Sequence, residues 1–167
     1  MSLLSFIKEA GEKLFSKGNA QAAMAQAQAN PADVEKSKAA NAAAGDAILA
    51  YIEEQNLKAT GLTVTFDGAM STATVYGIAA DQPTKEKIVL CAGNVHGVEK
   101  VNDQMTVDQS APEAQYYTVV RGDTLSKIAK QYYGDANKYP AIFEANKPML
   151  KSPDLIYPGQ MLRIPPL

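Results

Sequence analysis

Two stretches indicate the fold of the last third of the chain: Tyr116-Tyr-Thr-Val-Val-Arg-Gly-Asp-Thr-Leu125 and Tyr157-Pro-Gly-Gln-Met-Leu-Arg-Ile-Pro165. Each contains a short β-like run, and the segments between them have apolar residues at helical spacing. Asp123 or Thr124 can cap the first helix, and Gly134 can end it. The sequence therefore predicts a compact βααβ unit over residues 116–166.

The middle of the chain predicts a second unit with the order αββαβ over residues 46–109. The Asp67-Gly68 pair favours a hairpin turn, Pro83 suits a helix start, and Gly93 suits a helix end. The expected elements are a helix from residue 46 to 57, strands over 62–66 and 71–77, a helix over 84–93 and a strand over 97–107. With a short linker at residues 110–115, the chain is predicted to be an α+β protein of two small domains.

The first 45 residues divide into two segments of different composition. Residues 1–18 carry apolar side chains at helical spacing, which predicts an amphipathic helix over residues 2–16 that packs on the first domain. A membrane-surface helix is the alternative, but its basic residues are balanced by Glu9 and Glu12. Residues 19–45 are rich in Ala, Gln and Asn and predict a linker with partial helix, broken near Pro31.

Composition and charge exclude several classes of protein. The net charge is −2, so the chain lacks the basic excess expected of a nucleic-acid binder. Residues 116–167 carry a net charge of +3 and residues 1–115 a net charge of −5, which favours weak attraction between the two domains. Neither a secretory signal pattern nor an apolar run long enough for a membrane span is evident. We therefore expect a cytoplasmic monomer.

Two domain families resemble these units. The C-terminal unit, through the two stretches quoted above, resembles the LysM domain, a module that usually recognises N-acetylglucosamine glycans. The middle unit resembles the BON domain through Val-Tyr-Gly at residues 75–77, Gly-Asn-Val-His-Gly-Val at 93–98 and Val-Asn-Asp at 101–103. Together with residues 7–14 and 143–154, this pairing resembles a family of small bacterial cytoplasmic potassium-binding proteins. The resemblance implies a non-enzymatic K⁺ sensor or buffer whose two domains close around the ion.

The same resemblance implies a K⁺ site made of main-chain carbonyl oxygens, with no organic cofactor. K⁺ is selected by several neutral oxygens, and a helix C-terminus followed by a glycine-containing loop can supply them. The partial negative charge at a helix C-terminus also favours a cation. The candidate ligands are the carbonyls of Ile7, Ala10, Gly93, Val95 and Val98.

Two other functions remain open. A LysM domain implies binding of peptidoglycan or another N-acetylglucosamine glycan in the cell envelope, and a BON protein with an N-terminal helix could bind phospholipid. Asp123 and Thr124 would cap a helix, and Leu125 would be a core residue, even without a glycan. The candidate glycan contacts are Gly122, Asp123, Thr124, Leu125, Asn146, Ile156 and Tyr157.

Cys91 and His96 are candidates for catalysis, because they are the single thiol and the single imidazole of the chain. A nucleophile of this kind needs its base within hydrogen-bond distance. Cys91 falls in the apolar register of the expected helix, where a thiol is usually part of the core. We therefore expect no catalytic residue.

Overall fold

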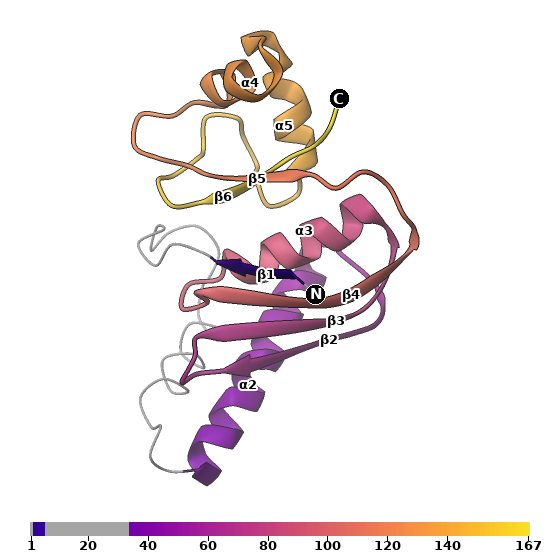
Figure 1. Cartoon of the computed structure of the whole chain (residues 1–167). Coiled ribbons are helices and arrows are strands. Elements are labelled where there is room, and N and C mark those ends of the chain that lie inside the picture. Colours follow the sequence, from indigo (N-terminus) through magenta and orange to yellow (C-terminus); the bar gives the residue numbers. More distant parts are fainter. Residues whose placement is uncertain (1, 6–33) are drawn as a thin grey trace.

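The computed structural model describes residues 2–5 and 34–167, which form two α+β units stacked on one another (Figure 1). The first unit comprises α2 (Val34–Glu54), β2 (Thr60–Asp67), β3 (Thr72–Asp81), α3 (Gln82–Gly93) and β4 (Lys100–Gln109). The second comprises β5 (Gln115–Thr118), α4 (Leu125–Tyr133), the 3-10 helix η1 (Ala136–Lys138), α5 (Tyr139–Ala145) and β6 (Met161–Ile164). The orders αββαβ and βααβ confirm the predicted fold class.

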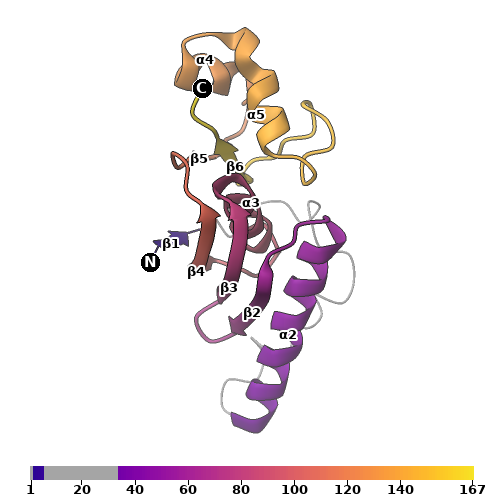
Figure 2. The same ribbon diagram turned by 90° about the vertical axis from the view of Figure 1, so that its right-hand side faces the viewer.

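The first unit is a sheet covered on one face by two helices (Figure 2). The strand order is β1-β4-β3-β2, with β1 formed by Ser2–Ser5. Strands β2 and β3 are antiparallel, whereas β3 and β4 are parallel and are connected through α3. Helix α2 packs on β2, and α3 packs on β3 and β4. The core between helices and sheet includes Ile48, Ile52, Val75, Ile88 and Val101.

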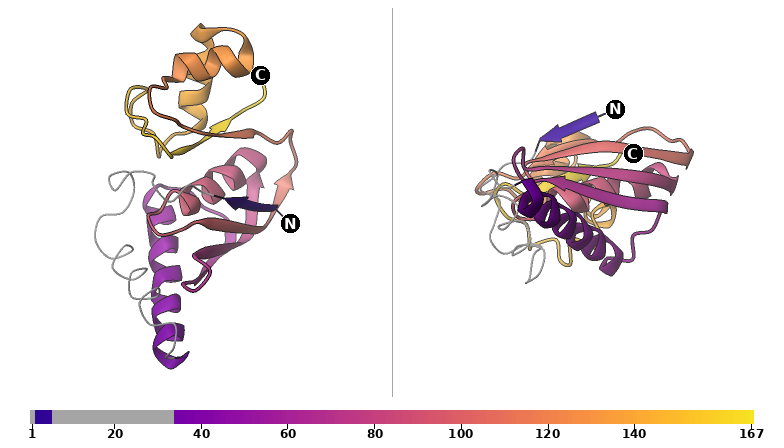
Figure 3. Two further views of the ribbon diagram at one scale, coloured as in Figure 1. Left: turned by 60° about the vertical axis from the view of Figure 1, so that its left-hand side comes forward. Right: turned by 90° about the horizontal axis from the view of Figure 1, so that it is seen from below.

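Helix α3 is defined at both ends by local chemistry. Its N-cap Asp81 accepts a hydrogen bond from the Thr84 N–H at 2.8 Å. Hydrogen bonds from the side chain and from the main chain of Thr84 lower the pKa of the Asp81 carboxyl. Pro83 lies in the first turn, as predicted, and the helix ends at Gly93. Because α3 is short and buried, it sets the position of the loop that follows it. It lies between the sheet and the second unit (Figure 3).

The N-terminal prediction is wrong where it can be checked. Ser2–Ser5 is a strand, β1, that pairs antiparallel with β4, so the predicted helix does not begin at residue 2. An edge strand of a sheet offers hydrogen bonds to every second residue, and this pairing overrides a weak helical spacing. The rest of the predicted helix, with Ile7 and Ala10, lies outside the described residues.

Several further boundaries differ from prediction. Strand β3 extends to Asp81 rather than ending at residue 77, and β4 begins at Lys100 rather than at residue 97. Helix α2 begins at Val34 rather than at Asp46, so it extends well into the segment predicted as a linker, where alanines favour helix. The turn after β2 is longer than Asp67-Gly68. It spans residues 68–71, where Asp67 accepts hydrogen bonds from the N–H groups of Ala69 and Met70, and Ser71 has a φ of 48°.

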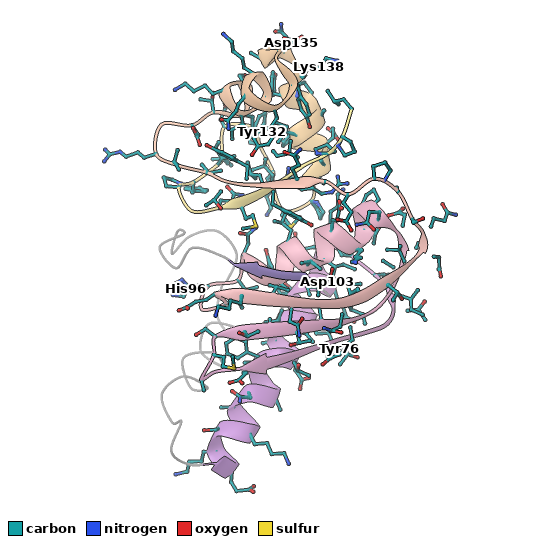
Figure 4. The ribbon with its side chains drawn as sticks, viewed as in Figure 1. Tyr76, His96, Asp103, Tyr132, Asp135 and Lys138 are labelled. Atoms are coloured by element: carbon teal, nitrogen blue, oxygen red, sulfur yellow. The ribbon has the colours of Figure 1, made fainter. Side chains whose placement is uncertain are left out.

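The second unit has a small core of its own between its two-stranded sheet and its helices. Thr124 caps α4 by accepting a hydrogen bond from the Lys127 N–H at 3.2 Å, and Gly134 ends α4 at a φ of 73°. Tyr117 and Tyr132 meet edge to face, with ring centroids 5.8 Å apart. Figure 4 labels Tyr132 in this unit. The core residues are Val119, Leu125, Ile128, Ala129, Ile142, Leu150, Leu162 and Ile164.

Candidate ion-binding site

The loop between α3 and β4 begins at the C-terminus of a buried helix. The N–H of its C-cap residue Asn94 donates to the Leu90 carbonyl at 3.0 Å, which completes the last helical turn. The carbonyls beyond this turn have no later helical N–H to accept from, and they carry the partial negative charge of a helix end. Gly97 then takes a φ of 96°, which reverses the chain toward β4.

Two buried valines hold this loop against the core of the first unit. The side chains of Val95 and Val98 are both part of the core cluster. The Val98 N–H donates to the Val95 carbonyl at 3.1 Å, and that oxygen has a second lone pair available. At the far side of the loop, the N–H groups of Glu99 and Lys100 donate to the Ser71 carbonyl. The main chain of the loop is therefore fixed from both ends.

The donor chemistry of the loop fits a weakly hydrated monovalent cation. Its oxygens are neutral main-chain carbonyls, the donors that select K⁺. Within residues 2–5 and 34–167, no group of three or more His, Cys, Asp or Glu side chains could hold a metal ion.

Three of the five residues predicted as carbonyl ligands lie at the end of α3 and in the loop that follows it. Gly93 is the last residue of α3, and Val95 and Val98 follow within the loop. Ile7 and Ala10 lie outside the described residues. Cys91 is buried in the core, where burial raises the pKa of its thiol, whereas the side chain of His96 is exposed in the loop (Figure 4).

Asn94 connects the loop directly to the second unit. Its side-chain Nδ2 donates to the Met161 carbonyl at 3.1 Å, and its Oδ1 accepts from the Met161 N–H at 3.2 Å. The amide thus bonds to the main chain of β6 as a neighbouring strand would. The Met161 side chain packs in the core cluster of the first unit. Sequence reasoning missed this contact, because nothing local links residues 67 positions apart.

Arg163, two residues after Met161 in β6, is hydrogen-bonded in the same way by an asparagine of the second unit. Asn146, the C-cap of α5, accepts from the Arg163 N–H at 2.8 Å and donates to the Arg163 carbonyl at 2.8 Å. Asn94 and Asn146 therefore occupy one edge of β6, while β5 pairs along the other. The strand is hydrogen-bonded on both edges although its sheet has two strands.

A buried ion pair forms the second connection between the units. Glu86 of α3 and Arg163 of β6 are 3% and 5% exposed, and Arg163 Nε donates to Glu86 Oε2 at 2.5 Å. The other carboxylate oxygen, Oε1, accepts from Gln82 Nε2 and from the Ala114 N–H, both at 2.9 Å. Glu86 therefore joins the first unit, the inter-unit linker and the second unit. Tyr116 is buried beside this pair, and its burial raises the pKa of its hydroxyl group.

Several predicted glycan contacts are engaged inside the second unit. Asn146 is 1% exposed and bonded to β6, and Leu125 is buried in the core. Asp123 accepts from the Tyr117 hydroxyl at 2.7 Å, and this bond raises the pKa of Tyr117 to about 12. The remaining four, Gly122, Thr124, Ile156 and Tyr157, are exposed or half-buried. The predicted set is therefore only partly accessible.

Among the described helices, none combines the length and the apolar character that crossing a bilayer requires. Helix α2, the longest of them, carries charged residues at both ends and Asp46 within it.

Comparison with known proteins finds both domain families and one relative along nearly the whole chain. The BON domain family matches residues 41–109, and the LysM domain family matches residues 117–165. The potassium binding protein Kbp of Escherichia coli O6:H1 is 43% identical over 169 residues, covering 99% of both chains. An uncharacterized protein of Deinococcus radiodurans is 57% identical over 49 residues, covering 29% of this chain and 19% of its own. An esterase of Mycobacterium tuberculosis is 47% identical over 53 residues, which is 11% of its length.

Proposed function

The chain belongs to the family of the Escherichia coli potassium binding protein Kbp, and from this membership we propose that it binds K⁺ without catalysing a reaction. The structural observation that carries the proposal is the loop after α3. This loop combines the C-terminus of a helix, two buried valines and Gly97, which has positive φ. A site of this kind needs no acidic side chain, because K⁺ is bound by carbonyl dipoles.

In this proposal the ion is held by the main-chain oxygens of Gly93, Val95 and Val98, with those of Ile7 and Ala10 completing the site. The protein acts in the cytoplasm as a monomeric K⁺ sensor or buffer and becomes more compact when the ion binds. The contacts that join the loop and α3 to β6 support the compaction, because they offer the bound form an interface that the ion can stabilise.

The test is thermal unfolding of the full chain in KCl and in NaCl at equal ionic strength. A ligand at about 100 times its dissociation constant stabilises the binding form by about 2.7 kcal/mol. For a chain of this size, that corresponds to a rise in Tm of roughly 5–10 °C. A rise in KCl alone supports the proposal, and superimposable curves in the two salts contradict it.

Two glycine variants test whether the rise in Tm in KCl depends on the loop after α3. Gly97→Ala places a side chain at a φ of 96°, so the loop must change shape and the difference between the two salts should shrink. Gly134→Ala makes the same kind of change at the end of α4, at a φ of 73° and away from the loop. This control should lower the Tm equally in both salts. Equal K⁺ effects in both variants would place the ion elsewhere.

Glycan binding is the second candidate, and the LysM match over residues 117–165 favours it. It predicts that insoluble peptidoglycan or chitin retains the protein in either salt, through residues around Gly122 and Tyr157. Retention that is independent of K⁺, together with no K⁺ effect on the Tm, would favour this function over ion binding. Loss of retention in Tyr157→Ala would locate it to the LysM unit.

A further inference from the structure

We propose that Asn94 is a positioning residue that couples the shape of the loop between α3 and β4 (residues 94–99, the ion loop) to the docking of the C-terminal domain. The inference rests on the proposed function and adds a route by which ion binding becomes domain docking. Asn94 lies between Gly93 and Val95, two of the proposed carbonyl ligands, and its side chain bonds to Met161 of β6. One residue thus belongs to the ion loop by its main chain and to the domain interface by its side chain.

The backbone of Asn94 does not require an asparagine. Its φ of −82° and ψ of 1° are open to any L-residue. The local turn therefore does not explain the choice of side chain. The two bonds to Met161 do, because an amide is a side chain that can both accept from a main-chain N–H and donate to the carbonyl of the same residue.

The geometry makes the contact sensitive to the shape of the loop. Both bonds, at 3.1 and 3.2 Å, are at the long end of ordinary hydrogen bonds, so a small displacement of the Asn94 Cα weakens the pair. An ion that fixes the carbonyls on either side of Asn94 also fixes that Cα. In addition, the Met161 side chain packs in the same core cluster as Val95 and Val98, so core packing and the Asn94 amide both connect β6 to this loop.

Thermodynamic linkage relates the K⁺ affinity to the stability of the Asn94–Met161 contact. If ion binding favours the Asn94–Met161 contact by some factor, the contact favours ion binding by the same factor. Removing the amide should therefore weaken K⁺ binding, although the amide itself is not a ligand of the ion. If the contact formed only in the ion-bound protein, the loss of two hydrogen bonds of ordinary strength would lower the K⁺ affinity by roughly 30-fold. We expect a fall of about tenfold, because only the part of the contact energy that depends on the ion is transferred to K⁺ binding.

The experiment measures K⁺ affinity by calorimetry and the radius of gyration by small-angle scattering, with and without K⁺. The proteins are the full-length wild type, Asn94→Ala and the control Asn137→Ala. Asn137 is an exposed asparagine of the second domain whose side chain donates to the nearby Asp135. We expect Asn94→Ala to bind K⁺ about tenfold more weakly and to compact less, and Asn137→Ala to match the wild type. Circular dichroism checks that both variants are folded.

A second variant separates coupling from simple electrostatics. Asn94→Asp retains the acceptor for the Met161 N–H but sets a carboxylate oxygen against the Met161 carbonyl. A negative charge beside a cation site would strengthen K⁺ binding if the side chain at position 94 affected the ion only through electrostatics. The coupling role predicts the opposite sign, a weaker affinity than that of the wild type. Affinity equal to or tighter than that of the wild type in Asn94→Asp overturns the inference.

The remaining outcomes distinguish the inference from the function on which it rests. A wild type that binds K⁺ and compacts, with an Asn94→Ala variant that does both to the same extent, overturns the coupling role and leaves the proposed function in place. A wild type that shows no heat of K⁺ binding and no compaction overturns the proposed function and the inference with it.

Discussion

Glu86 connects three parts of the molecule, namely α3, the linker and β6. Its carboxylate accepts hydrogen bonds from Arg163, Gln82 and the main chain of Ala114, and both charged partners are almost fully buried. A buried ion pair stabilises a fold only when its polar atoms are satisfied, and here each carboxylate oxygen has a partner. The pair therefore specifies how α3 and β6 are placed relative to one another.

Replacing Glu86 by glutamine should lower the free energy of unfolding by about 3–5 kcal/mol, because Arg163 is left as a buried charge without a counter-charge. Either orientation of the new amide also turns its NH₂ group toward a donor. Urea unfolding measures the loss. The control is Glu144→Gln, since Glu144 pairs with Lys147 on the surface and its side chain is 63% exposed. The control should change stability by less than about 1 kcal/mol. Equal effects in both variants would contradict the structural role of Glu86.

At the residue scale, the sequence could indicate the loop but not the interface. Gly93 and Gly97 marked a helix end and a turn, and the structure has both. The bonds from Asn94 to Met161 and from Glu86 to Arg163 join residues 67 and 77 positions apart. No periodicity or capping rule reaches that far. The charge difference between the domains predicted attraction in general and could not identify the pair.

Helix α2 and strand β2 meet at a glycine. A Cβ on Gly45 would lie 2.6 Å from the Val64 carbonyl oxygen and 3.3 Å from the Thr65 Cα. Both are main-chain atoms of β2 and cannot move without disturbing the sheet. The absence of a side chain at this position is therefore what allows the helix to lie so close to the strand.

This contact reverses the usual effect of a glycine-to-alanine change in a helix. In an exposed helix, Gly→Ala stabilises by about 1 kcal/mol, whereas overpacking a core costs about 1–3 kcal/mol. Gly45→Ala should therefore lower the free energy of unfolding by about 1–2 kcal/mol in urea. Ala42→Gly, at an exposed position of the same helix, tests helix propensity alone and should lower the free energy of unfolding by about 1 kcal/mol. A higher urea midpoint for Gly45→Ala would show that the contact is relaxed.

At the element scale, the types of helix and strand were predictable and several boundaries were not. The closing strand Met161–Ile164 and the start of α4 at Leu125 agree with prediction, since each has a turn or cap beside it. The strand at Ser2–Ser5 was missed because its partner, β4, is distant in sequence. Helix α2 starts before Asp46 because an alanine-rich segment continues a helix without large apolar residues.

At the scale of the molecule, α3 lies between the sheet of the first domain and the second domain within the described residues (Figures 1 and 3). Met149 and Met161 of the second domain belong to the core cluster of the first, and Tyr116 packs against it. The core of the first domain therefore extends into the second domain. Small units of this size gain much of their stability from such contacts.

The shared core predicts that the two domains unfold together. In differential scanning calorimetry, the full chain in KCl should give one transition whose van't Hoff and calorimetric enthalpies agree. Two resolved transitions, or a van't Hoff enthalpy well below the calorimetric value, would show that the domains are energetically independent. In that case the inter-domain bonds would position the domains without stabilising them.

The wide separation of Glu86 and Arg163 in the sequence also governs how the molecule is made. Arg163 is synthesised 77 residues after Glu86, which at about 5–20 residues per second is a delay of roughly 4–15 s. During this interval the sheet and α3 leave the ribosome, while the carboxylate of Glu86 still lacks its cation. The order of synthesis therefore lets the strands and helices of the first domain pair before β6 can supply Arg163 and the Met161 side chain.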